Sequence, residues 1–189
     1  SEHALVPLLN WIKTKSNEGD EETLRAAVEC CLALCQATSD DPRTRARASQ
    51  NMSRLLEEKD ALLTLLTLLS LSHGFYTRFG ALQLLVLLVE HRRLEVQEYV
   101  LTAPGGSSSV LQCLEAAPSS STEIIRNEAL LLLPQLVRDN ADIQKIVAFE
   151  GAFERLLDII VQEGRIEGGV VVQDALDGLE ALLLQNVSN

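Results

Sequence analysis

The chain has 189 residues, of which 47% are hydrophobic and 4% aromatic, and its formal net charge at pH 7 is -11. Such an acidic chain is not expected to bind nucleic acid or an anionic membrane surface, because both require a basic footprint. A protein partner with a basic face is compatible with this charge. The hydrophobic residues are mainly Leu and Ala, which favours packed helices, and the length suffices for a sizeable core.

The first predicted helices cover residues 4–14 and 24–37, where apolar residues recur at helical spacing. The second contains the run CCLALC, in which Cys31 and Cys35 are four residues apart and share a face. Two such thiols would be half of a zinc site, but no nearby His or Cys pair completes the four ligands. We therefore expect the cysteines of this run, Cys30, Cys31 and Cys35, to be reduced core residues.

Three further groups follow, each with a short, a middle and a long apolar helix. The short helices are predicted over 45–58, 94–102 and 141–149, the middle ones over 60–71, 108–117 and 151–160, and the long ones over 76–91, 123–139 and 170–186. The helix predicted over 4–14 corresponds to a middle helix, because it precedes the first long helix, over 24–37. Pro134 lies inside a long helix, where a kink is expected.

The four long helices repeat one pattern, a small residue with apolar residues four and seven positions later. Its anchors lie 53, 48 and 46 residues apart, namely Val28, Ala81, Ala129 and Ala175. These offsets are close to the period of armadillo and HEAT units, and three helices per unit is the armadillo pattern. We predict an all-α fold, an armadillo-like right-handed superhelix of about four three-helix repeats. It would form one solenoid over 1–189, with approximate repeats 1–43, 44–92, 93–139 and 140–189.

A glycine corner separates two helices in the stretch IQKIVAFEGAFERLLDII, residues 143–160. Gly151 is expected to take the left-handed conformation that ends one helix before the next begins at an angle. Gly105 and Gly106 stand at the same corner one repeat earlier. The recurrence supports a helical repeat.

No group of residues has the spacing of a catalytic, cofactor-binding or metal site. The three His lack partners at ligand spacing, the Ser runs have loop composition, and no phosphate-binding Gly-rich loop is present. The acidic pairs at 21–22, 40–41 and 57–58 are expected to be solvated. The long helices also lack the Asn ladder of armadillo peptide grooves. We therefore do not expect the chain to be an enzyme or to bind a cofactor. We also do not expect a peptide groove of the kind that uses an Asn ladder.

Residues 123–176 resemble the globular head of the general vesicular transport factor family, the Uso-type Golgi tethers. The similar pieces are IRNEALLLL, IQKIVAFE, AFERLLDII and GGVVVQD, in family order. The chain departs from the family after VVVQD, where Asp177 and Gly178 weaken the apolar stripe of the last helix. The absence of a heptad tail suggests an internal piece of the head.

The resemblance implies a scaffold for vesicle tethering in ER-to-Golgi and intra-Golgi transport. Family members are cytoplasmic, peripheral on Golgi and vesicle membranes without inserting into them, and form homodimers. They engage Rab-type GTPases, golgins and SNARE machinery. An armadillo-repeat adaptor that binds another protein or peptide outside membrane traffic is the alternative.

No family motif assigns the partner-contact residues one by one. Polar groups at the start of a long helix and on the long loop over 162–169 are the proposed contact residues. An alternative role for them as helix caps and solvated surface stays open. These candidates are Arg126, Asn127, Glu128, Glu163, Arg165 and Glu167.

Overall fold

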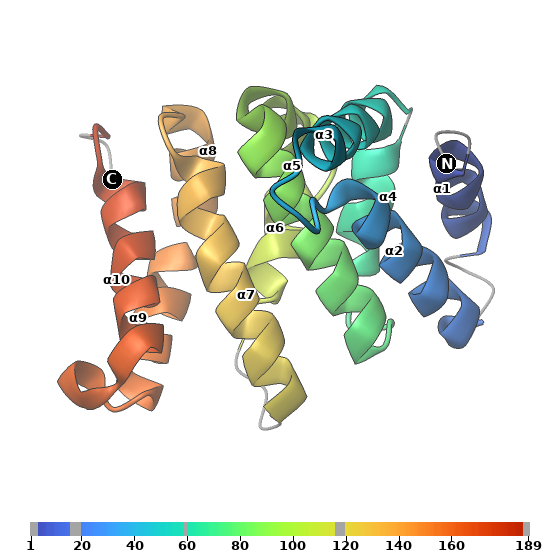
Figure 1. Ribbon diagram of the computed structural model, residues 1–189. Helices are drawn as coiled ribbons and strands as arrows, with labels where there is room; N and C mark the ends of the chain where they lie inside the picture. Colours follow the sequence, from blue (N-terminus) through green and yellow to red (C-terminus); the bar gives the residue numbers. More distant parts are fainter. Residues whose placement is uncertain (1–3, 16–19, 59, 116–119, 187–189) are drawn as a thin grey trace. The chain divides into compact units, whose positions relative to one another are not determined.

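The computed structural model describes residues 4–15, 20–58, 60–115 and 120–186, and it contains helices but no strand in these ranges. The predicted all-α class is confirmed. The chain divides into two compact units, Ser1–Arg92 and Arg93–Asn189. Figure 1 shows the order of the helices within each.

The first unit contains α1 (Leu5–Lys15), α2 (Glu21–Cys35), α3 (Pro42–Glu57), α4 (Ala61–Leu68) and the first part of α5 (Phe75–Thr102). The second contains the remainder of α5, α6 (Gly106–Gln112), α7 (Ser120–Val137), α8 (Ala141–Phe149), α9 (Ala152–Gln162), the 3-10 turn η1 (Arg165–Glu167) and α10 (Gly169–Leu183). Residues 116–119, which include the end of the helix predicted over 108–117, lie outside the described residues.

Helix α5 is interrupted at Arg92, whose φ of -143° and ψ of 66° are not helical. The predicted helices over 76–91 and 94–102 lie on either side of this residue. The division between the two compact units falls directly after it. The four repeat boundaries given above stay a prediction.

Capping residues set the start of two helices in the first unit. Asp20 accepts a hydrogen bond from the Thr23 N–H ahead of α2, and Asp41 accepts one from Thr44 ahead of α3. Helix α3 has 16 residues, so the expectation of a short helix there was wrong. Its cap and the Pro at its first position start it three residues earlier than the apolar pattern does.

Glu21 contradicts the expectation that the acidic pairs are only solvated. Its Oε1 accepts a hydrogen bond of 2.7 Å from the N–H of Gly74, immediately before α5. Its Oε2 lies 3.4 Å from Nδ1 of His73. The side chain therefore caps a helix more than 50 residues away in the sequence, a contact that local sequence patterns do not reveal.

The predicted pattern of the long helices corresponds to the core. All four small anchors have an exposed fraction of 0%: Val28, Ala81, Ala129 and Ala175. The positions seven residues later are also buried: Cys35, Leu88, Leu136 and Leu182. Of the positions four residues later, Leu85 and Leu133 are buried whereas Leu32 and Leu179 are half-buried.

The glycine corners are confirmed, and a third corner is occupied by aspartate. Gly105 and Gly151 have φ of 67° and 88° directly ahead of α6 and α9. Asp60 has φ of 64° directly ahead of α4. Aspartate is one of the few residues besides glycine that visits this conformation. The sequence pattern missed this corner because it contains no glycine.

Helix α10 packs closely even though Asp177 and Gly178 interrupt its apolar stripe. It contacts α7, α8 and α9. Gly178 is buried, and a Cβ at this position would lie 3.3 Å from both Cδ atoms of Leu156. Asp177 is exposed. The expected weakness in this helix's packing is therefore wrong, because Gly178 permits close approach and Asp177 faces away from the core.

Candidate functional site

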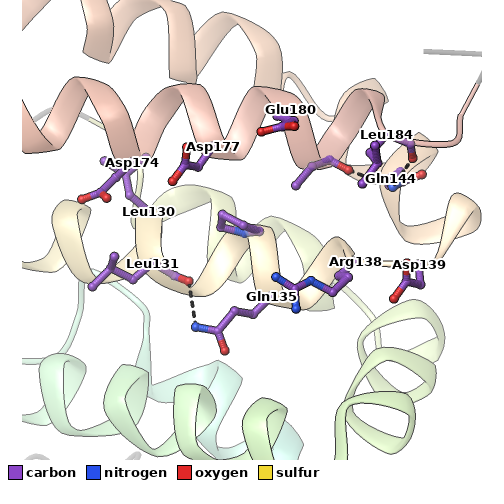
Figure 2. Close-up of a pocket in the computed structure, with 12 residues that line it drawn as sticks. Leu130, Leu131, Gln135, Arg138, Asp139, Gln144, Asp174, Asp177, Glu180 and Leu184 are labelled. Atoms are coloured by element: carbon purple, nitrogen blue, oxygen red, sulfur yellow. Dashed lines mark hydrogen bonds between the residues drawn. The ribbon is translucent and has the colours of Figure 1, made fainter.

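The two long helices of the second unit, α7 and α10, enclose a groove of about 490 Å³ (Figure 2). Helix α8 contributes one residue, Gln144, to its lining. The α7 side, including the residues just after the helix, consists of Leu130, Leu131, Pro134, Gln135, Arg138 and Asp139. The α10 side consists of Asp174, Asp177, Glu180, Ala181 and Leu184.

The α10 wall carries a row of carboxylates. Asp174, Asp177 and Glu180 follow at intervals of three residues, which is a rise of about 4.5 Å per step along a helix. Figure 2 shows Asp174 and Asp177 on the side of α10 that faces α7. Burial raises the pKa of Asp174, and the nearby charge of Asp177 raises it further. The wall is therefore a region of concentrated negative charge.

The α7 wall combines exposed apolar surface with a helix that Pro134 interrupts. Leu131 is 47% exposed. Pro134 has no N–H, so the Leu130 carbonyl lacks the donor that an uninterrupted helix would provide four residues later. The side-chain amide of Gln135 donates a hydrogen bond of 3.3 Å to the Leu131 carbonyl. At the end of this wall, Asp139 forms an ion pair of 3.0 Å with Arg93.

Two buried glutamines fix the ends of the groove-forming helices. Nε2 of Gln144 donates hydrogen bonds of 2.8 and 3.2 Å to the carbonyls of Ala181 and Leu184. Nε2 of Gln97 donates in the same way to Leu136 and Arg138, at 2.8 Å each. Each amide thus satisfies carbonyls at the end of a long helix.

Sequence reasoning missed these glutamines, although a signal was present. Gln97 and Gln144 each follow a buried apolar residue and lie three positions before a buried valine. A polar residue recurring at this position of the short helix is a repeat feature. It could have been found by aligning the short helices as well as the long ones.

The structure brings together three of the six predicted contact residues. Arg126 is buried, its Nη2 lies 2.5 Å from Oε1 of Glu163, and the same nitrogen lies 3.2 Å from Oδ1 of Asn127. Arg126 therefore anchors the segment that leads into η1. None of the six predicted residues lines the groove.

The remaining three predicted residues differ in exposure. Glu128 is half-buried, and burial raises the pKa of its carboxyl. Arg165 and Glu167 are exposed on η1. These two side chains are available to a partner at the surface.

The described ranges, 4–15, 20–58, 60–115 and 120–186, contain neither a metal-binding cluster nor a membrane-spanning helix. In these ranges, no group of three or more His, Cys, Asp or Glu side chains could hold a metal ion. Among the described helices, none combines the length and the apolar character needed to cross a bilayer.

The chain is similar to proteins of vesicular transport, although no family model matches it. It is 39% identical to golgin candidate 6 of Arabidopsis thaliana over 165 residues, which is 86% of this chain and 18% of that protein. It is 43% identical to general vesicular transport factor p115 of Bos taurus over 141 residues, 75% of this chain and 14% of that protein. The chain thus spans less than a fifth of these relatives.

A crystal structure of Uso1-1 superposes on the chain with a TM-score of 0.82 and 29% sequence identity. The match covers 97% of this chain and 31% of that one. The likeness confirms the predicted armadillo-like helical repeats.

Proposed function

Because the chain belongs to the family of general vesicular transport factors that includes p115 and Uso1, we propose that it is a protein-interaction scaffold of a vesicle tethering factor. The factor would act in ER-to-Golgi and intra-Golgi transport. The observation that supports this most strongly is the 43% identity to p115 over 75% of the chain. The relatives' names favour a role in vesicular transport over an adaptor role outside membrane traffic.

The proposed partners are a Rab-type GTPase, golgins and SNARE machinery, met on the cytoplasmic side of Golgi and vesicle membranes. A homodimer is part of the same proposal. The surface proposed for partner contact comprises Arg165 and Glu167 on η1, Glu163 and Asn127, which both contact Arg126, and Glu128. Arg126 would act by holding Glu163 in place, since its own side chain is buried.

A cell-free ER-to-Golgi transport assay tests the proposal. Excess purified chain should compete with the endogenous tether for its partners and inhibit arrival of cargo at the Golgi. Uptake of an endocytic cargo in the same extract is the control and should be unaffected. Transport that proceeds unchanged at a large molar excess of the chain would contradict the proposed function.

The contact surface is tested separately in the same assay. Arg165→Ala combined with Glu167→Ala should relieve the inhibition. The matched control is Arg47→Ala with Glu57→Ala, an exposed pair on α3 in the other unit. Equal inhibition by both variants would remove η1 from the proposal while leaving the tethering role intact.

A further inference from the structure

We propose that the groove between α7 and α10 binds a Lys- or Arg-containing segment of a partner protein. This site is distinct from the η1 surface, and the proposal does not depend on the tethering role. It rests on the charge of the groove, on its hydrogen-bond acceptors, and on its length and exposed apolar residues.

The charge of the groove is largely uncompensated. Among the described residues, none forms an ion pair with Asp174, Asp177 or Glu180. Asp177 accepts only a neutral hydrogen bond of 2.7 Å, from Nε2 of Gln173. Arg138 is the basic residue of the lining, at the far end of α7 from Leu130. A cationic ligand would relieve the repulsion between the carboxylates on α10.

Four of the five charged side chains in the lining are carboxylates, namely Asp139, Asp174, Asp177 and Glu180, and a carboxylate accepts hydrogen bonds without donating any. Lysine and arginine side chains carry several donors and no acceptor. Their head groups therefore complement the carboxylates of the groove, whereas an acidic or phosphate-bearing ligand would be repelled.

The dimensions suit a short peptide segment. From Asp174 to Leu184 the α10 wall rises about 15 Å, which four or five residues of extended chain span. Leu131 and Leu184 are 47% and 53% exposed within the lining. Such apolar surface can cover the aliphatic stems of long basic side chains while their charged ends reach the carboxylates.

The test uses the 189-residue chain and a fluorescein-labelled peptide of about eight residues containing Lys, Arg and Leu. Binding is measured by fluorescence anisotropy at low salt. The groove variant neutralises the acidic row with Asp174→Asn, Asp177→Asn and Glu180→Gln. The control variant removes the same charge from exposed positions elsewhere in the second unit, with Glu98→Gln, Glu123→Gln and Glu154→Gln.

We expect the groove variant to bind the peptide about tenfold more weakly and the control variant to change by less than about twofold. Circular dichroism of both variants verifies that they are folded. Equal weakening in both variants would show attraction by net charge alone and would overturn the proposal, as would no binding by the unaltered chain.

A second copy of the chain is the competing occupant, since α3 carries Arg43, Arg45 and Arg47. Sedimentation velocity distinguishes binding of a partner segment from binding of a second copy of the chain. Self-association that is lost in the groove variant, without peptide binding, would overturn the partner-segment proposal. A negative result in the transport assay would leave the groove's peptide binding unaffected.

Discussion

Cys30 and Cys31 are neighbours in the sequence, yet Cys30 is exposed and Cys31 is buried. The expectation that the cysteines of this helix are all core residues was wrong for Cys30, because adjacent helical positions point in different directions. Burial raises the pKa of Cys31 to about 12, with further contributions from Cys35 and Cys30. Burial also raises the pKa of Cys35, to about 11.

Thiol reactivity checks this difference. Because the thiolate is the reactive form and must be accessible, iodoacetamide at pH 8 should modify Cys30 first in the folded chain. Cys31, Cys35 and the buried Cys113 should react only after unfolding in denaturant. The measurement is peptide mass spectrometry over a time course. Modification of Cys31 at the rate of Cys30 would contradict the packing of α2.

The cap formed by Glu21 predicts a pH dependence of stability. Burial by itself would raise the pKa of Glu21, but the nearby Thr77 hydroxyl, the hydrogen bonds with Gly74 and His73, and the charge of His73 bring it below its ordinary value of 4.5. A lowered pKa in the folded state means that the ionised carboxylate contributes stability above pH 4.5. That contribution is lost as the pH falls through the folded-state value.

We therefore expect Glu21→Gln to cost about 0.5 kcal/mol at pH 7, because a neutral amide is a weaker cap than a carboxylate. The difference from the unaltered chain should close as the pH falls below 4.5 and through the lowered pKa. Urea unfolding across this pH range measures the difference in unfolding free energy. The control is Glu22→Gln, which changes the exposed neighbouring residue. A difference that persists unchanged at low pH would argue against the charged cap.

At the scale of the helices, close packing of α5 on α2 depends on Gly80. A Cβ at this position would lie 2.7 Å from Cγ1 of Val28, a fully buried β-branched residue with little freedom to move. Gly80→Ala should therefore destabilise the chain by about 1–2 kcal/mol, despite the higher helix propensity of alanine. Chemical denaturation measures the loss.

The matched control is Gly178→Ala in α10. Its added Cβ would meet the flexible ends of Leu156 at 3.3 Å, so the change in unfolding free energy should be smaller. If Gly80→Ala lowered the unfolding free energy no more than Gly178→Ala does, the close contact between α2 and α5 would be contradicted.

The glutamine that closes the end of α10 should contribute strongly to the second unit. In Gln144→Met the carbonyls of Ala181 and Leu184 lose their buried donor, which costs about 1–3 kcal/mol. Lys145→Met changes the next residue of the same helix, which is exposed, and should cost less than about 0.5 kcal/mol. Thermal unfolding monitored by circular dichroism compares them, and equal melting temperatures would contradict the role of Gln144.

At the scale of the whole chain, the repeating pattern on the long helices was enough to predict the fold class. Packing of an apolar stripe is a periodic property, so Val28, Ala81, Ala129 and Ala175 could be assigned to the core from spacing alone. The glycine corners followed from the same logic. The corner at Asp60 could not be predicted in this way, because aspartate, unlike glycine, does not by itself indicate a left-handed backbone conformation.

The acidic groove could not be predicted from the sequence. In the sequence, Asp177 was interpreted only as an interruption of the apolar stripe of the last helix, and Pro134 only as a kink. Their relation depends on α7 and α10 facing each other, although the two rows are about 40 residues apart in the sequence. The same holds for the ion pair between Arg126 and Glu163, which joins two predicted contact residues through tertiary structure.

The central claim, an interaction scaffold of a vesicle tether, is tested most directly by titrating the chain with an early-secretory Rab-type GTPase. Isothermal calorimetry with the GTP-loaded and the GDP-loaded forms gives the two affinities. Binding to the GTP-loaded form should be at least about tenfold tighter than binding to the GDP-loaded form, a difference of about 1.4 kcal/mol. The double substitution Arg165→Ala with Glu167→Ala should weaken binding to the GTP-loaded form. Equal affinity for the two forms, or no binding to either, would contradict the proposed GTPase contact within this chain.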